Sequence, residues 1–289
     1  MTIFTRFPDH EACIDHLERV RWADEPSCPH CSSSRVSRKS DGQRVGRWNC
    51  YDCHSSFNVL SGTIFSKTKI PLQKWFLAIG LMVNAKKSLS SCQLARDLGL
   101  NQKSAWYLQT RVRAEMMTRQ GKILLYGIVE ADEAYIGGRP RKPNNRTDFK
   151  PAKRGRGTAK TPILGAVERG GRVVAQVADD MTGRGILDFV LDTVSTDESL
   201  LITDESQLYR AVSPFMDHAV IKHKERYVDG LVHTNTIEGF WSLLKRAWYG
   251  QHHHYQRHYT PLYAAEAAWK YNHREGAGGF SNFLRGCFA

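Results

Sequence analysis

Residues 122–138, KILLYGIVEADEAYIGG, decide the fold class because their pattern is that of a β-strand. The segment before them, residues 71–116, follows the period of α-helices, so the chain changes character at this point. The strand carries Asp132, an acidic residue that is a candidate for catalytic chemistry. The sequence therefore predicts a separate structural unit that begins at residue 121.

Towards the C-terminus, strands and helices follow one another. We predict strands at 161–171, 171–179 and 199–206, and helices at 183–194, within 230–250 and at 259–274. The run SLLITDES, residues 199–206, is short and apolar and ends in Asp204, as a buried central strand would. Three strands, a helix, a strand and further helices make an α/β unit.

Three acidic residues of this unit are candidates for one site: Asp132 on the first strand, Asp204 ending the fourth, and Glu238 on a later helix. They converge if the first and fourth strands are neighbours. Three carboxylates without a basic partner repel one another, and divalent cations relieve that repulsion. Oxygen ligands at low count suit Mg²⁺ or Mn²⁺, and two such ions about 3.5–4 Å apart support phosphodiester cleavage and joining.

The helix that carries Glu238 lies in GLVHTNTIEGFWSLLKRAWYG, residues 230–250. At about 100° per residue, Glu238 and Lys245 point within roughly 20° of each other, beside the apolar stripe that includes Trp241. A purely structural interpretation is also open, in which Asn235 is the N-cap and Glu238 closes a capping-box-like pair. The helix alone does not decide between catalysis and capping.

Four of the seven cysteines form two C-x-x-C pairs with eighteen residues between them. The pairs consist of Cys28, Cys31, Cys50 and Cys53. This spacing predicts a four-cysteine Zn²⁺ site, and four thiolates close the tetrahedron, so the zinc is structural. The residues between the pairs predict two strands joined by a turn at 41–42.

Residues 69–120 predict a helical DNA-binding region. One helix stops at Gly99, and Asn101 caps the next helix, which carries Arg111 and Arg113. A short helix, a glycine turn and a basic final helix resemble a helix-turn-helix whose recognition helix comes last. A plain helical hairpin is the alternative.

The formal net charge of +12 favours a polyanionic partner. Residues 139–160 hold nine Lys or Arg against one acid, and they predict a mobile loop that contacts phosphates or is merely solvated. The N-terminal residues are unlike a signal peptide, and the longest apolar run, 75–83, is too short to cross a bilayer. We expect a cytoplasmic protein.

Seven motifs occur in order along nearly the whole chain. They are SGTIFSKTKIPLQKWF, LARDLGLNQKSAWYLQTRVR, VEADEAYIGGR, LLITDES, VHTNTIEGFWSLLKR, GQHHHYQRHY and WKYNHR. Together with the zinc ribbon before them, they resemble the ISXO-like bacterial insertion-sequence transposases of the DDE superfamily. The resemblance implies a ribonuclease-H-like catalytic core, with Asp132 and Asp204 as the first two ligands of Mg²⁺ or Mn²⁺.

The third ligand implied by the resemblance is either of two residues. Members of the group have Glu or Asn at this point, followed by a Lys, and this sequence has both Asn235 and Glu238. We favour Glu238, with Lys245 placed to hold a DNA phosphate near the metals. Glu130 is a candidate for a supporting role behind the ligands, and His233 for a role near the scissile phosphate.

The sequence-based hypothesis is a DNA transposase that binds the terminal inverted repeats of its element, hydrolyses the phosphodiester at the transposon end and joins the 3′-OH to target DNA. At least a dimer should assemble on the DNA. We expect a zinc ribbon in 1–68, a helix-turn-helix region in 69–120 and the catalytic domain in 121–289. The alternatives are a transposase-derived DNA-binding regulator without catalysis and a structure-selective DNA nuclease.

Overall fold

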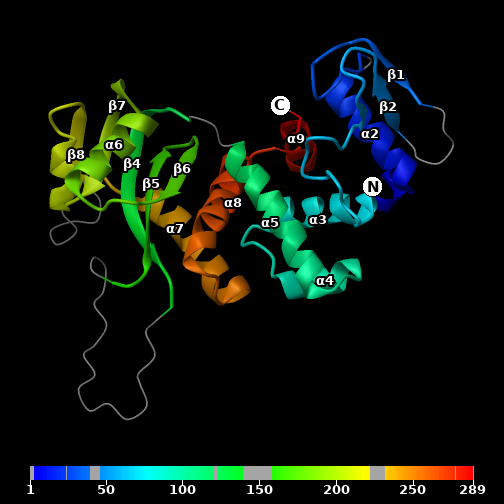
Figure 1. Ribbon diagram of the computed structural model, residues 1–289. Coiled ribbons are helices and arrows are strands. Elements are labelled where there is room, and N and C mark those ends of the chain that lie inside the picture. The colour runs from blue at the N-terminus through cyan, green and yellow to red at the C-terminus, as the bar shows by residue number, and fades with distance from the viewer. Residues whose placement is uncertain are drawn as a thin grey trace. The chain divides into compact units, whose positions relative to one another are not determined.

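The chain forms two compact units in the computed structural model (Figure 1). The residues described are 3–23, 25–39, 46–119, 123–138, 158–221, 232–276 and 278–288. The first unit comprises Met1–Ala85, Leu89–Glu115 and Gly276–Ala289, and the second comprises Lys86–Ser88 and Met116–Glu275. The C-terminal residues thus group with the N-terminal part of the chain, whereas the expected division placed them in the catalytic part.

A five-stranded mixed sheet forms the centre of the second unit, in the order β6-β5-β4-β7-β8. The strands are β4 (Leu125–Ile136), β5 (Thr161–Glu168), β6 (Val173–Val177), β7 (Val194–Asp204) and β8 (Asp217–Ile221). β4, β7 and β8 are parallel, while β5 pairs antiparallel with both β4 and β6. The first and fourth strands of this unit are therefore neighbours, as the convergence of the acids requires.

Helices cover both faces of this sheet. They are α6 (Gly183–Thr193), α7 (Asn235–Ala247) and α8 (Thr260–Asn272), with the short turns η1 (Gln207–Ala211), η2 (Trp248–His252) and η3 (Arg257–Tyr259). Side chains alternate along β4, so that Ala134 packs with α7 and α8 whereas Ala131 packs with α6. By the same alternation, Asp132 faces α7.

A small antiparallel sheet of order β1-β2-β3 lies in the first unit. Its strands are β1 (Val36–Arg38), β2 (Arg47–Cys50) and β3 (Ser56–Asn58), and the flanking helices are α1 (Ile3–Arg6), α2 (His10–Trp22) and α9 (Gly279–Gly286). The pairing of β1 with β2 confirms the two strands predicted between the cysteine pairs. The predicted turn at 41–42 lies outside the described residues.

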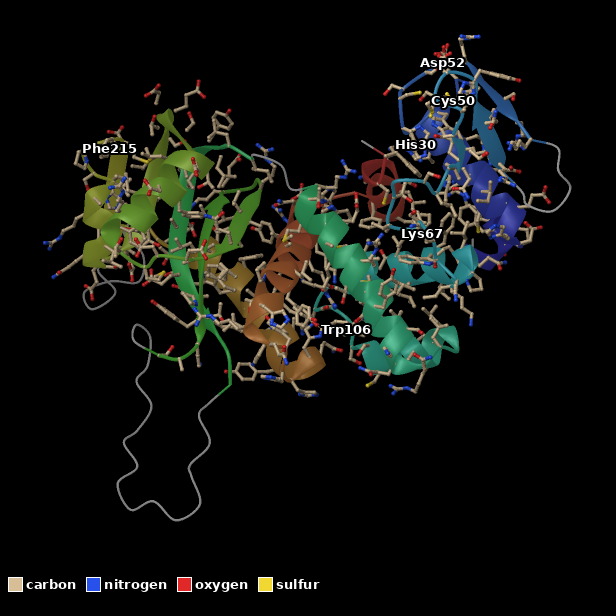
Figure 2. The ribbon with its side chains drawn as sticks, in the orientation of Figure 1. His30, Cys50, Asp52, Lys67, Trp106 and Phe215 are labelled. Atoms are coloured by element: carbon tan, nitrogen blue, oxygen red, sulfur yellow. The ribbon has the colours of Figure 1, made fainter. Side chains whose placement is uncertain are left out.

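Three helices form the expected helical region. They are α3 (Leu72–Asn84), α4 (Ser91–Leu98) and α5 (Gln102–Thr118), the last carrying Trp106 (Figure 2). α4 ends at Gly99, whose φ of 57° is left-handed, and the Asn101 side chain accepts from the Ser104 backbone N–H at 2.8 Å. The two arginines for which we predicted a basic final helix are not exposed side chains. Arg113 is only 1 % exposed, and Arg111 donates to backbone carbonyls at 3.3 Å.

Two further expectations from the sequence concern membrane-spanning helices and the basic loop of residues 139–160. Within the described ranges, no helix is long and apolar enough to span a membrane. Residues 139–157, most of the predicted basic loop, lie outside those ranges, and the last lysine of the loop, Lys160, lies just before β5.

Candidate active site and zinc site

Asp132 and Asp204 lie on neighbouring parallel strands, Asp132 within β4 and Asp204 at the end of β7. After a register shift between Leu125 and Gly127, β4 and β7 pair in constant register from Gly127 opposite Ser199 to Glu130 opposite Ile202. Asp132 and Asp204 each follow this last pair by two residues, so the register aligns them and directs both side chains to the face of the sheet covered by α7. The structure thus brings the first two predicted ligands together.

An indole N–H contacts the Asp132 carboxylate. Trp241 on α7 is 2 % exposed, and its Nε1 donates to Asp132 Oδ2 at 3.1 Å. Gly165 on β5 is the register partner of Asp132, and a Cβ at this position would lie 2.6 Å from indole carbons of Trp241. The absence of a side chain at Gly165 therefore leaves the space through which the indole reaches the carboxylate.

A buried ionic cluster fixes the start of α7. The Glu130 carboxylate is fully buried and accepts from two backbone N–H groups in the first turn of α7, at 2.8 and 3.0 Å. Arg169 Nε donates to the same carboxylate at 2.6 Å, and His233 Nδ1 lies 3.3 Å from it. A carboxylate satisfies the free N–H groups of a helix N-terminus and interacts favourably with its dipole. Glu130 thus holds α7 against the strand that carries Asp132.

The capping interpretation of Asn235 is wrong. Thr234 occupies the N-cap position, and Asn235 is the exposed first residue of α7. Glu238 accepts from the Thr234 hydroxyl at 3.2 Å, whereas a capping box pairs the carboxylate with a backbone N–H. The carboxylate that does accept the first-turn N–H groups is Glu130, from another strand.

Asp132, Asp204 and Glu238 line one pocket of about 590 Å³, together with Lys245. Asn235 is not part of its lining. The three carboxylates are not drawn to one point: in the described part of the chain, only the four cysteines place three or more ligand atoms of His, Cys, Asp or Glu within 4.8 Å of one another.

The electrostatic environment of Asp132 suits a cation. Burial, followed by the charges of Glu133 and Asp204, raises the pKa of Asp132 to about 7, while a hydrogen bond with the Glu133 backbone and the charge of Lys245 oppose the rise. A bound divalent ion would reverse these effects because positive charge favours the ionised carboxylate. The hard oxygen donors of this pocket match the ligand preference of Mg²⁺ or Mn²⁺.

Two residues of the site's framework, Arg169 and Gly165, escape prediction from the sequence. Arg169 lies in the turn between β5 and β6, and its neighbouring glycines suggest only a turn. His233, predicted to have a role near a scissile phosphate, has Nδ1 3.0 Å from Arg169 Nη2 in the cluster at the start of α7, and that role stays a prediction. The acidic residue Glu130, a candidate for a supporting role, contacts α7 and not Asp132 directly.

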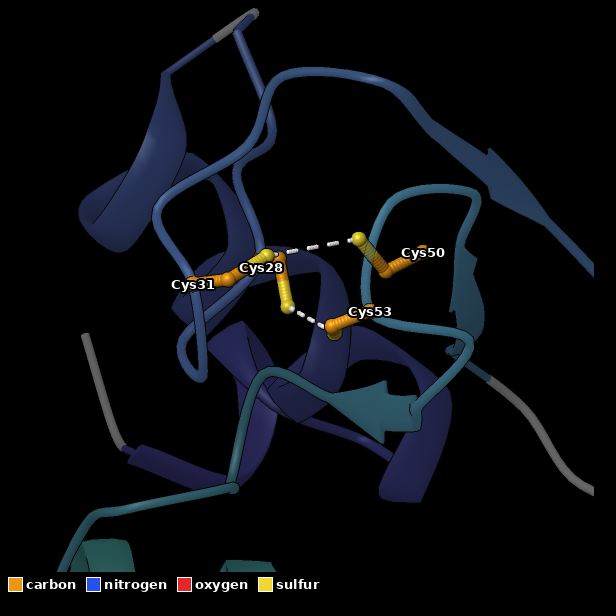
Figure 3. Close-up of side chains that lie close together, drawn as sticks. All are labelled: Cys28, Cys31, Cys50 and Cys53. Atoms are coloured by element: carbon orange, nitrogen blue, oxygen red, sulfur yellow. Dashed lines mark hydrogen bonds between the residues drawn. The ribbon is translucent and has the colours of Figure 1, made fainter.

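The four cysteines meet between two tight turns (Figure 3). The Sγ atoms of Cys28 and Cys53 are 3.6 Å apart, as are those of Cys31 and Cys50. Tetrahedral zinc with Zn–S bonds of about 2.3 Å places its sulfurs about 3.8 Å apart, so the geometry suits structural Zn²⁺.

Two family models cover the parts of the chain that contain the two sites. A family model described as an ISXO2-like transposase domain matches residues 124–272, more than half of the chain, and a transposase zinc-ribbon domain matches residues 8–56. A protein of the transposable element ISH50 from Halobacterium salinarum is 29 % identical over 264 residues, which cover 85 % of each chain.

Solved structures of Mos1 complexes show a weaker similarity. The Mos1 strand transfer complex has a TM-score of 0.24 and 12 % identity, covering 72 % of this chain and 75 % of that one. The mariner Mos1 paired-end complex with Mg has a TM-score of 0.24 and 11 % identity, with 73 % and 76 % covered. Similarity at this level is too distant to carry an inference. By the family match over more than half of its length, the chain belongs to the ISXO2-like transposases.

Proposed function

We propose that this protein is a metal-dependent DNA transposase that cleaves DNA at the ends of its element and joins them to target DNA. One observation carries the proposal: in a chain of a transposase family, Asp132 and Asp204 are aligned on adjacent parallel strands and share a pocket with Glu238 and Lys245. The sheet order and strand directions agree with the expected ribonuclease-H-like core.

Asp132, Asp204 and Glu238 would hold two Mg²⁺ or Mn²⁺ ions. When bound, such ions activate the attacking oxygen and stabilise the leaving one. Lys245 would hold a phosphate of the DNA beside them. Asn235 remains the alternative third ligand; its position outside the pocket lining favours Glu238.

The other expected parts would position DNA. The zinc ribbon of 1–68 and the helical region of 69–120 would bind the terminal inverted repeats, and the loop 139–160 would contact phosphates. On α5, the exposed residues Lys103 and Tyr107 lie near the N-terminal end, the part of a recognition helix that contacts bases. The catalytic domain would span 121–289, and two protomers would assemble on paired ends.

Strand cleavage of an end-containing DNA duplex in Mg²⁺ tests the proposal. We expect the wild-type protein to nick the duplex and transfer the freed 3′-OH to a second DNA, and Asp204→Ala to bind the duplex without cleaving it. Wild-type cleavage by Asp204→Ala would refute the metal-site assignment.

The same assay separates the two other functions. A DNA-binding regulator would bind the ends without cleavage at any Mg²⁺ concentration. A structure-selective nuclease would cut branched DNA and give no strand transfer.

A further inference from the structure

We call the pocket lined by Asp132, Asp204 and Glu238 the acidic pocket. Two further hollows adjoin it and extend it into a groove. The second hollow, of about 270 Å³, shares Lys245 and Tyr249 with the acidic pocket. The third, of about 170 Å³, shares Ile136, Gly137, Lys160 and Trp248 with the second. We call the second and third hollows together the side groove. It begins beside the carboxylates and ends at η3.

The charged residues that line the side groove are mostly cations. Lys245 comes from the last turn of α7, Lys160 from the residues before β5 and Arg257 from η3, while Glu133 is its one acidic lining residue. Two distant parts of the sequence, residue 160 and residues 245–257, thus bring positive charge to one concave surface. Such a lining favours a chain of phosphates.

Tyr249 displays an aromatic ring where the side groove meets the acidic pocket. Its exposure of 62 % is the highest among the large exposed apolar side chains of the described residues, above the 53 % of Phe215. It lies in η2, which is a π-helical turn. Such turns are rare in proteins, and those that occur are often at functional sites. The preceding residue, Trp248, is buried and packs edge-on against Tyr255, with the two ring centroids 4.3 Å apart. The turn is therefore anchored while Tyr249 faces outward.

We propose that the side groove binds a single strand of DNA next to the scissile phosphate, with a base stacked on Tyr249 and phosphates held by Lys160 and Arg257. The two hollows, of about 270 and 170 Å³, lie below the range of about 300–1,000 Å³ typical of small-molecule pockets, so each is too small to admit a duplex. A cationic groove with an aromatic platform is the arrangement that binds single strands with little sequence preference. The inference rests on the proposed function for its choice of DNA.

Fluorescence anisotropy of a labelled ten-nucleotide oligothymidylate, without added divalent ion, tests the side groove in the full zinc-loaded chain. Removing one stacked base contact weakens single-strand binding about 5- to 150-fold, which is the effect expected for Tyr249→Ala, whereas Tyr249→Phe keeps the ring and most of the affinity. Arg257→Ala should weaken binding and lower the salt slope by about 0.7.

Matched controls are an exposed tyrosine and an exposed arginine outside the groove, Tyr126→Ala and Arg184→Ala, both expected to bind like wild type. Irradiation of an oligonucleotide that carries 5-iodouracil should crosslink the base to Tyr249, as read by mass spectrometry of the peptides. Groove variants that bind like the controls, crosslinks confined to other residues, or tighter binding of the matching oligouridylate would overturn the proposal. Because the assay needs no cleavage, a groove that binds in a chain that never cleaves would contradict only the proposed function.

Discussion

At the scale of single residues, the site depends on how Asp132 is held. The indole N–H of Trp241 donates a hydrogen bond to Asp132 Oδ2 at 3.1 Å and so orients the carboxylate. Groups that orient a metal ligand in this way contribute about 10- to 100-fold to metal affinity or activity. We therefore predict that Trp241→Phe, which keeps the packing but removes the donor, lowers Mg²⁺-dependent cleavage by about that factor and raises the Mg²⁺ concentration needed. An unchanged Mg²⁺ dependence would show that the contact has no role in the site.

A substitution at Gly165 tests the packing of the Trp241 indole that makes the contact with Asp132. An added Cβ would lie 2.6 Å from the indole of Trp241, so Gly165→Ala should lower the free energy of unfolding by about 1–3 kcal/mol, as overpacking does. Gly239→Ala is the matched control, because a Cβ there meets nothing within 4 Å and alanine favours the helix. Denaturant unfolding of both variants measures the difference. Equal stability of the two variants would contradict the packing described here.

At the scale of secondary-structure elements, α7 is placed by its first turn. Glu130→Gln would leave Arg169 without its buried carboxylate, and breaking a buried pair destabilises by about 3–5 kcal/mol. The matched control is Asp188→Asn in the exposed pair with Arg184, where a change within about 0.5 kcal/mol is expected. Chemical denaturation followed by tryptophan fluorescence measures both. If both variants lowered the free energy of unfolding by a similar small amount, the cluster around Glu130 would not be what holds α7 in place.

The elements themselves could largely be predicted from the sequence, because their signals are local. The apolar run that ends in Asp204 and the period of α7 need no knowledge of distant residues. The capping of α7 could not be predicted, since its acceptor, Glu130, lies about a hundred residues earlier on β4. The position of Arg169 could not be predicted either, because its partners Glu130 and His233 are also distant from it in the sequence. The predicted convergence of Asp132 with Asp204 depended on the assumption that their strands are neighbours. The sheet order confirms that β4 and β7 are adjacent.

At the scale of the whole molecule, the zinc site belongs to the first unit and the acidic pocket to the second. Loss of zinc should therefore affect them unequally. We predict that Cys31→Ser lowers zinc content and the thermal stability of the first unit, because a structural zinc site contributes directly to folding. Hydrogen exchange resolved by peptide should show faster exchange in β1–β3 and unchanged exchange in β4–β8. Uniform exchange, with zinc lost, would contradict a structural role.

The grouping of the chain into units shows the limit of sequence reasoning at this scale. A Gly-rich stretch before α9 marks the end of α8, but its composition does not say which unit α9 joins. α9 packs against α3 within the first unit, a contact between segments about two hundred residues apart. The three-part division at 1–68, 69–120 and 121–289 stays a prediction.

The central claim is that Asp132, Asp204 and Glu238 together hold divalent metal. Anomalous diffraction from Mn²⁺-soaked crystals of the protein bound to its end DNA measures this most directly. We predict anomalous peaks about 2.1 Å from carboxylate oxygens of Asp132 and Asp204, with Glu238 completing the set. Manganese bound elsewhere, with the three carboxylates still apart on the DNA complex, would contradict the claim.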